Sequence, residues 1–134
     1  MAIYNDVKLC NVGVYSFSPR KNQCSAQYVF DVAKLRDPAS NKSLRSRFND
    51  GRASEVKDWI KQDYRVASIL AEARILTEDS ISIQRGPWFS IAFSDTHGKW
   101  ISPSVAELVA EMLSTAGFNV YVAHLTLGDK EVPA

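Results

Sequence analysis

Apolar residues in this chain fall into short runs separated by polar segments. Four runs are rich in β-branched and aromatic residues, which is the usual composition of buried strands. They predict strands over residues 7–17, 28–32, 88–93 and 118–123. The second run, YVFDV, is mostly apolar and is therefore expected to be buried on both faces. A short alternating segment, SISIQ at residues 80–84, predicts an edge strand.

Between these runs, apolar positions recur with helical spacing. Residues 53–61 carry Val56, Trp59 and Ile60, an i, i+3, i+4 pattern, and a second helical stretch follows over residues 66–76. The third predicted strand is followed by a polar loop and then by an amphipathic helix. In that helix, Ser102 is the expected N-cap, Pro103 the first helical residue and Gly117 the glycine that ends it.

Strands that alternate with helices predict an α/β fold, a small and mostly parallel sheet flanked by helices. The length of 134 residues fits one domain over residues 1–134. Residues 36–51 contain Pro, Asn and Asp-Gly and are expected to form a long surface loop, and residues 85–87 a turn. Residues 125–134 are expected to be a loosely ordered tail.

The charge and cysteine content narrow the functional classes. The net charge is +1, which gives no overall field for attracting nucleic acid or an anionic membrane. There is no long apolar segment and no signal-peptide pattern, so we expect a cytoplasmic protein that does not contact membranes. Cys10 and Cys24 form no CxxC pair, so no zinc site is predicted; reduced thiols are favoured, and a disulfide stays possible.

The candidate chemistry lies at the ends of the predicted strands. In an open parallel sheet, ligands bind beyond the carboxyl ends of the strands, and the start of the following helix attracts anions. Basic, hydroxyl and carboxylate groups there suit a polar phosphorylated ligand. The candidates are Ser18, Arg20, Asp31, Asp95, Thr96, His97, Gly98, Lys99, Trp100, Ser102 and His124.

Each candidate also has an ordinary structural interpretation. Thr96 and Ser102 are residue types that cap turns and helices, and Asp95 suits a turn. Trp100 offers a flat apolar surface for a base or a sugar ring, or equally a core side chain. For Asp31 a functional role is favoured, because it stands within an apolar strand, where a buried carboxylate is costly unless it is paired. The loop is not a Walker A motif, because no Ser or Thr follows Lys99, so ATP hydrolysis has little support.

Four segments together resemble the RapZ C-terminal domain family. They are SFSPR at residues 16–20, VFDVAKL at 29–35, AFSDTHGKWIS at 92–102 with Ala106-Glu107 beyond it, and GFNVYVAHLTL at 117–127. Their order and spacing match the family over most of the chain, with a small gap in the first loop. The resemblance implies a domain that binds glucosamine-6-phosphate, forms oligomers and, in full-length members, contacts RNA and an RNase.

Carried over by position, the resemblance implies a ligand set, and the chain also departs from the family motif. Asp95 stands in place of a Cys, His97 in place of a Gly, and Trp100-Ile101 in place of His-Arg. Two further arginines, after Val32 and after His124, are missing, which weakens the case for RNA. The implied ligand residues are Arg20, Asp31, Asp95, Thr96, Gly98, Lys99, Ser102 and His124.

Three functions follow from these observations. The favoured hypothesis is non-catalytic binding, for sensing or sequestration, of an amino-sugar phosphate or a nucleotide-derived signal, by a homo-oligomer without a cofactor or metal. The second is an RNA or protein adapter, for which residues 42–52 are the best basic surface. The third is a phosphoester-processing enzyme in which Asp31, Asp95 and His97 or His124 act as acid and base.

Overall fold

A computed structural model describes residues 11–84, 88–128 and 132–133. Its centre is a five-stranded sheet in the order β2-β3-β1-β4-β5. The first four strands are parallel, and the short β5 pairs antiparallel with β4. The predicted α/β fold, with a small and mostly parallel sheet, is therefore confirmed. The strands are β1 (Asn11–Phe17), β2 (Tyr28–Asp31), β3 (Trp88–Ser94), β4 (Asn119–His124) and β5 (Val132–Pro133).

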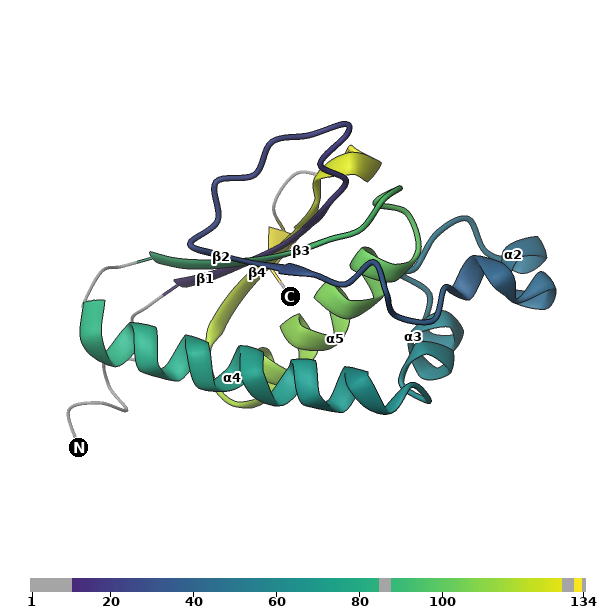
Figure 1. Ribbon diagram of the computed structural model, residues 1–134. Helices are drawn as coiled ribbons and strands as arrows, with labels where there is room; N and C mark the ends of the chain where they lie inside the picture. The colour runs from purple at the N-terminus through teal and green to yellow at the C-terminus, as the bar shows by residue number, and fades with distance from the viewer. Residues whose placement is uncertain (1–10, 85–87, 129–131, 134) are drawn as a thin grey trace.

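The two long helices cover one face of this sheet. Figure 1 shows α4 (Tyr64–Gln84) and α5 (Ile101–Thr115) together beneath the strands, while residues 18–27 cross the opposite face. Side chains alternate along β1, so that Val12 and Val14 join Leu113 of α5 in the main core, and all three are fully buried. The sheet is thus covered by helices on one side and by irregular chain on the other.

The start of α5 differs from its prediction. The helix begins at Ile101, with Trp100 as the N-cap residue and no capping side chain, so Ser102 lies inside the first turn and the prediction that it caps the helix is wrong. Its hydroxyl donates instead to Asp95, which is a tertiary contact that local sequence does not specify. Gly117 follows the C-cap residue Ala116 with φ of 100°, so its predicted role as the terminating glycine is confirmed.

Residues 36–51 are not the long loop that we expected. They contain a 3-10 helix, η1 (Pro38–Ser40), and α2 (Lys42–Arg47), which are followed by α3 (Ser54–Ile60). The side chain of Asp37 caps η1 by accepting from the Ala39 N–H group, and that of Asn41 caps α2 by accepting from Leu44. Polar residues that suggest a loop therefore act here as helix caps.

The segment SISIQ at residues 80–84 was expected to be an edge strand, and that prediction is wrong. It is the last turn of α4. Ser80 and Ile81 are buried, whereas Ser82 and Ile83 are exposed. Two buried positions followed by two exposed ones fit a helical period, and a strand would alternate singly.

Strand β2 is also more exposed than predicted. Tyr28 is 40% exposed and Val29 48%, because β2 is an edge strand that pairs with β3 alone. An apolar run does not reveal whether its strand lies at the centre or the edge of a sheet. At the other edge, where a loose tail was expected, residues Leu125–Leu127 form the 3-10 helix η2 and β5 pairs with β4.

Some predictions fall outside the described residues: the part of the first strand before Asn11, the turn at residues 85–87, and residues 129–131 and 134 of the tail. Cys10 lies there too, and within the described residues Cys24 is a free thiol. Among the described residues, no helix is long and apolar enough to cross a bilayer.

The buried stripe of α5 makes a testable contribution to stability. We expect Leu113→Ala to lower the free energy of unfolding by about 3 kcal/mol, because it opens a cavity between α5 and the sheet. Ile75→Ala in α4 is the matched control, because Ile75 is 60% exposed and its loss is expected to cost under about 0.5 kcal/mol. Urea unfolding measures both, and equal losses would contradict the assigned core.

Candidate functional site

The carboxyl ends of the four parallel strands lie in one row. In the register of the sheet, Phe17 lies opposite Ser94, Ser16 opposite His124, and Asp31 opposite Ser94 on the outer side. The segments that leave these ends are therefore neighbours, as the sequence predicted for a parallel sheet. The polar residues 95–99 leave β3 at the middle of the row and lead directly into α5.

Asp95 organises this loop from within. It is buried, and its Oδ1 atom accepts hydrogen bonds from the Gly98 N–H group at 2.6 Å and the Ser102 hydroxyl at 2.9 Å. One bond closes the turn and the other ties the loop to the first turn of α5. The carboxylate also places negative charge where the helix dipole favours it.

Gly98 is where the loop packs most tightly. Its φ of 64° is left-handed, and an added Cβ atom would lie 2.8 Å from the Ser18 nitrogen and 2.8 Å from Thr126 Cβ. Ser18 is fixed in turn, because its N–H group donates to Thr126 Oγ1 and its hydroxyl donates to the Thr96 carbonyl. Three connections, after β1, β3 and β4, are thereby held together at one point.

Several donors of the loop stay available. The N–H groups of Thr96, His97 and Lys99 have no hydrogen-bond acceptor within the described part of the chain. Their side chains are exposed, and the Lys99 ammonium lies 6.0 Å from the centre of the Trp100 ring. The first turn of α5 adds little to this set, because Pro103 has no N–H group and Ile101 and Ser102 are buried. An anion can approach this group of donors from solvent.

His124 lies beneath the loop and is only 1% exposed. Its Nδ1 atom is 2.7 Å from the Ser16 hydroxyl and its Nε2 atom 2.5 Å from Glu107 Oε2. Both ring nitrogens are therefore occupied by protein groups. When Glu107 is ionised it can only accept, so Nε2 carries a hydrogen, and in the neutral imidazole Nδ1 then accepts from the Ser16 hydroxyl. This network joins β1, β4 and α5.

The segment between α2 and α3 supports the loop from the side. The Gly51 N–H group donates to the Lys99 carbonyl, and the Gly51 carbonyl accepts from the Ser104 hydroxyl. Asp50 forms a bidentate pair with Arg52. Burial opposes ionisation of Asp50, but the hydrogen bonds and charge of Arg52 outweigh it, so the pKa of the Asp50 carboxyl lies below its usual value.

Comparison with known proteins identifies the family. The model of the RapZ C-terminal domain matches residues 10–128. The chain belongs to the RapZ C-terminal domain family. It is 34% identical over 120 residues to a nucleotide-binding protein of Cereibacter sphaeroides, covering 87% of this chain and 39% of that protein. A nucleotide-binding protein of Ruegeria is 30% identical over 125 residues, covering 90% and 41%. The chain thus spans about two fifths of these relatives' length.

Of the residues that the RapZ family resemblance implied, one group lies together. Asp95, Gly98 and Ser102 are joined by hydrogen bonds, and Thr96 and Lys99 flank them on the exposed side of the same loop. His124 lies two residues before Thr126, which contacts this loop. Ser18, which came from the predicted strand ends, is bonded to the loop directly.

Other candidates do not join this group through their side chains. Asp31 is exposed, and its carboxylate accepts from the Ala33 N–H group in a local turn; the expectation of a buried carboxylate is therefore wrong. Arg20 is exposed, and only its backbone N–H group reaches Ser18. Trp100 is buried with Leu44 and Val56 in a second apolar cluster, so of its two interpretations the core side chain holds.

Sequence reasoning missed the residues that hold the site in place. Ser16, Asn22, Glu107 and Thr126 all bond to it or to its neighbours. Their partners are distant in sequence, as for Ser16 and His124, which are 108 positions apart. A polar residue inside an apolar run was the one available sign for Ser16. Within the described residues, no group of three or more His, Cys, Asp or Glu side chains is arranged to hold a metal.

The tight packing of Gly98 predicts an unequal response to substitution. We expect Gly98→Ala to lower the free energy of unfolding by about 2 kcal/mol or more, because it combines left-handed strain with a steric clash. Gly117→Ala also has positive φ, but nothing lies within 4 Å of the added methyl group, so about 1 kcal/mol is expected. Chemical unfolding compares the two, and a larger loss at Gly117 would contradict this account.

The buried histidine predicts a second contrast. Glu107→Ala is expected to cost about 1–2 kcal/mol of unfolding free energy, because it leaves the buried Nε2 atom of His124 without its partner. Glu107→Gln retains an oxygen that can accept and is expected to cost clearly less. Thermal or urea unfolding at neutral pH separates the two variants; indistinguishable stabilities would show that the contact contributes little.

Proposed function

We propose that this domain binds a small phosphorylated molecule without converting it, for sensing or sequestration. The ligand is an amino-sugar phosphate or a nucleotide-derived compound, with its phosphate at the loop of residues 95–99. The observation that carries this proposal is the set of N–H groups at Thr96, His97 and Lys99, which lack acceptors in the described chain and stand before the first turn of α5. Such donors suit phosphate oxygens.

Charge also favours a phosphate at this loop. Lys99 is exposed there, and a hydrogen bond from its ammonium to a phosphate is charge-assisted and roughly twice as strong as a neutral one. The relatives are named nucleotide-binding proteins, which supports a ligand of this class. Because they are more than twice as long as this chain, the name supports the proposal without assigning the site.

The arrangement of the acidic and histidine side chains supports binding over catalysis. Both ring nitrogens of His124 are engaged within the protein, Asp95 is occupied by Gly98 and Ser102, and Asp31 caps its own turn. A general acid or base must reach the substrate within about 3 Å. Of the residues suggested for acid–base chemistry, His97 is the one that these contacts do not engage, and it is exposed on the loop.

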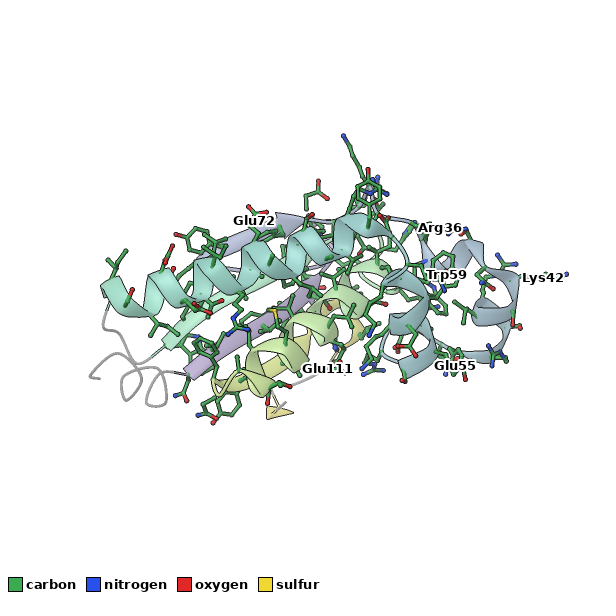
Figure 2. The ribbon with its side chains drawn as sticks, turned by 90° about the horizontal axis from the view of Figure 1, so that it is seen from below. Arg36, Lys42, Glu55, Trp59, Glu72 and Glu111 are labelled. Atoms are coloured by element: carbon green, nitrogen blue, oxygen red, sulfur yellow. The ribbon has the colours of Figure 1, made fainter. Side chains whose placement is uncertain are left out.

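Two of the four basic residues on the surface suggested for RNA are paired with carboxylates. Arg47 pairs with Glu55 and Arg52 with Asp50, while Arg45 donates to the Ala39 carbonyl. Figure 2 shows Lys42 at the outer end of this region and Glu55 close by. Paired arginines release fewer counterions from a nucleic acid, so a small ligand is favoured over RNA. Oligomer formation and a cytoplasmic location stay predictions.

The phosphate site is tested by binding measurements on two lysine variants. Calorimetric titration with glucosamine-6-phosphate, ribose 5-phosphate and nucleoside monophosphates is expected to give saturable binding to the wild type. Lys99→Ala is expected to weaken it at least about tenfold, equivalent to about 1.4 kcal/mol. Lys42→Ala on α2 is the control and is expected to leave the affinity unchanged.

Two results would contradict the proposal. One is equal affinity of the Lys99→Ala variant and the wild type for every compound bound. The other is conversion of the compound, seen by mass spectrometry after the bound material is released by denaturation. Recovery of the intact phosphorylated compound is the expected result.

A further inference from the structure

The connection from β1 to β2 leaves a hollow on the face of the sheet opposite the long helices. Because β3 lies between these two strands, residues 18–27 must cross the sheet, and Figure 1 shows them arching above it. The far end of the segment is fixed by the Gln27 N–H group, which donates to the Ser90 hydroxyl, and by the Gln27 side chain, which accepts from the Ser90 N–H group. The hollow is lined by Phe17, Pro19, Asn22, Gln23, Cys24 and Ser25.

The hollow adjoins the loop proposed to hold phosphate. Phe17 precedes Ser18, whose hydroxyl donates to the Thr96 carbonyl. Asn22, also in the lining, accepts a hydrogen bond from Thr126, and the side chain of Thr126 lies next to Gly98 in the loop. A ligand with its phosphate at residues 95–99 therefore has the hollow beside it for the rest of the molecule.

A chain of hydrogen bonds fixes the orientation of the Asn22 amide. Thr126 Oγ1 accepts from the Ser18 N–H group at 2.8 Å and donates its own hydrogen to Asn22 Oδ1 at 2.7 Å. With the amide oxygen placed by this bond, the NH₂ group lies on the other side of the amide. It has no acceptor among the described residues and supplies two donors. Because Asn22 lines the hollow, this NH₂ group is a candidate donor to a ligand there.

The lining of the hollow is neutral. It consists of an aromatic ring, a proline, two amides, a thiol and a hydroxyl, with no carboxylate and no basic group. The ammonium group of an amino sugar prefers a carboxylate partner, which this lining does not supply. A nucleobase has apolar faces for Phe17 and Pro19, and its ring nitrogens and carbonyl oxygens accept hydrogen bonds from amides.

We infer that this hollow receives the base of a nucleoside phosphate and that Asn22 donates to an acceptor on the edge of the base. The inference rests on the proposed function, because the phosphate is taken to lie at residues 95–99. It selects the nucleotide class over amino-sugar phosphates.

The experiment compares ligands that differ only in the base. Calorimetry on the full chain measures affinity for AMP, GMP, CMP and UMP, with ribose 5-phosphate and glucosamine-6-phosphate as references. At least one nucleoside monophosphate is expected to bind about tenfold or more tightly than ribose 5-phosphate. If none exceeds ribose 5-phosphate but either sugar phosphate binds, the hollow is wrongly assigned and the proposed function stands. If no compound binds, the proposed function fails as well.

Asn22→Asp is the decisive variant because it keeps the acceptor for Thr126 while removing the NH₂ donors. Its added charge affects all phosphates alike, so the measure is the ratio of nucleotide affinity to ribose 5-phosphate affinity. That ratio is expected to fall at least about fivefold. Asn41→Asp at the N-cap of α2 is the matched control and is expected to leave the ratio unchanged. An unchanged ratio in Asn22→Asp overturns the assignment of Asn22.

Discussion

The close approach of Gly98 to Ser18 and Thr126 is the constraint on which the rest of this site depends. At this point the connections after β1, β3 and β4 meet without space for a side chain. A left-handed glycine lets the loop turn there, and Asp95 closes the turn by accepting from the Gly98 N–H group. In the loop that this contact holds, the N–H groups of Thr96, His97 and Lys99 have no acceptor among the described residues.

Beneath the loop, charge and hydrogen bonding keep the frame rigid. His124 is held from both sides by Ser16 and Glu107, and the Gly51 backbone fixes the Lys99 carbonyl from the α2–α3 connection. A loop held on several sides loses little conformational entropy when it binds a ligand. Preorganised backbone donors of this kind suit the binding of an anionic group.

The parts that local sequence determines were predictable. The β-branched runs predicted β1, β3 and β4, and the segment ending at Gly117 predicted the end of α5, because both depend on neighbouring residues. The order of the strands depends on packing between distant segments, so the exposure of β2 and Asp31 was not predicted. The same limit applies to Ser102, whose residue type predicts a cap but whose partner is Asp95 seven residues earlier.

The irregular connection between β1 and β2 has a consequence for how such domains diversify. Parallel strands are usually joined by a helix, whose own packing restricts change. Here residues 18–27 lie outside the helix-covered core, anchored near Ser18 and at Gln27, while the residues between them line the hollow. Substitutions in this segment can therefore change which ligand is bound without disturbing the packing of the sheet and helices.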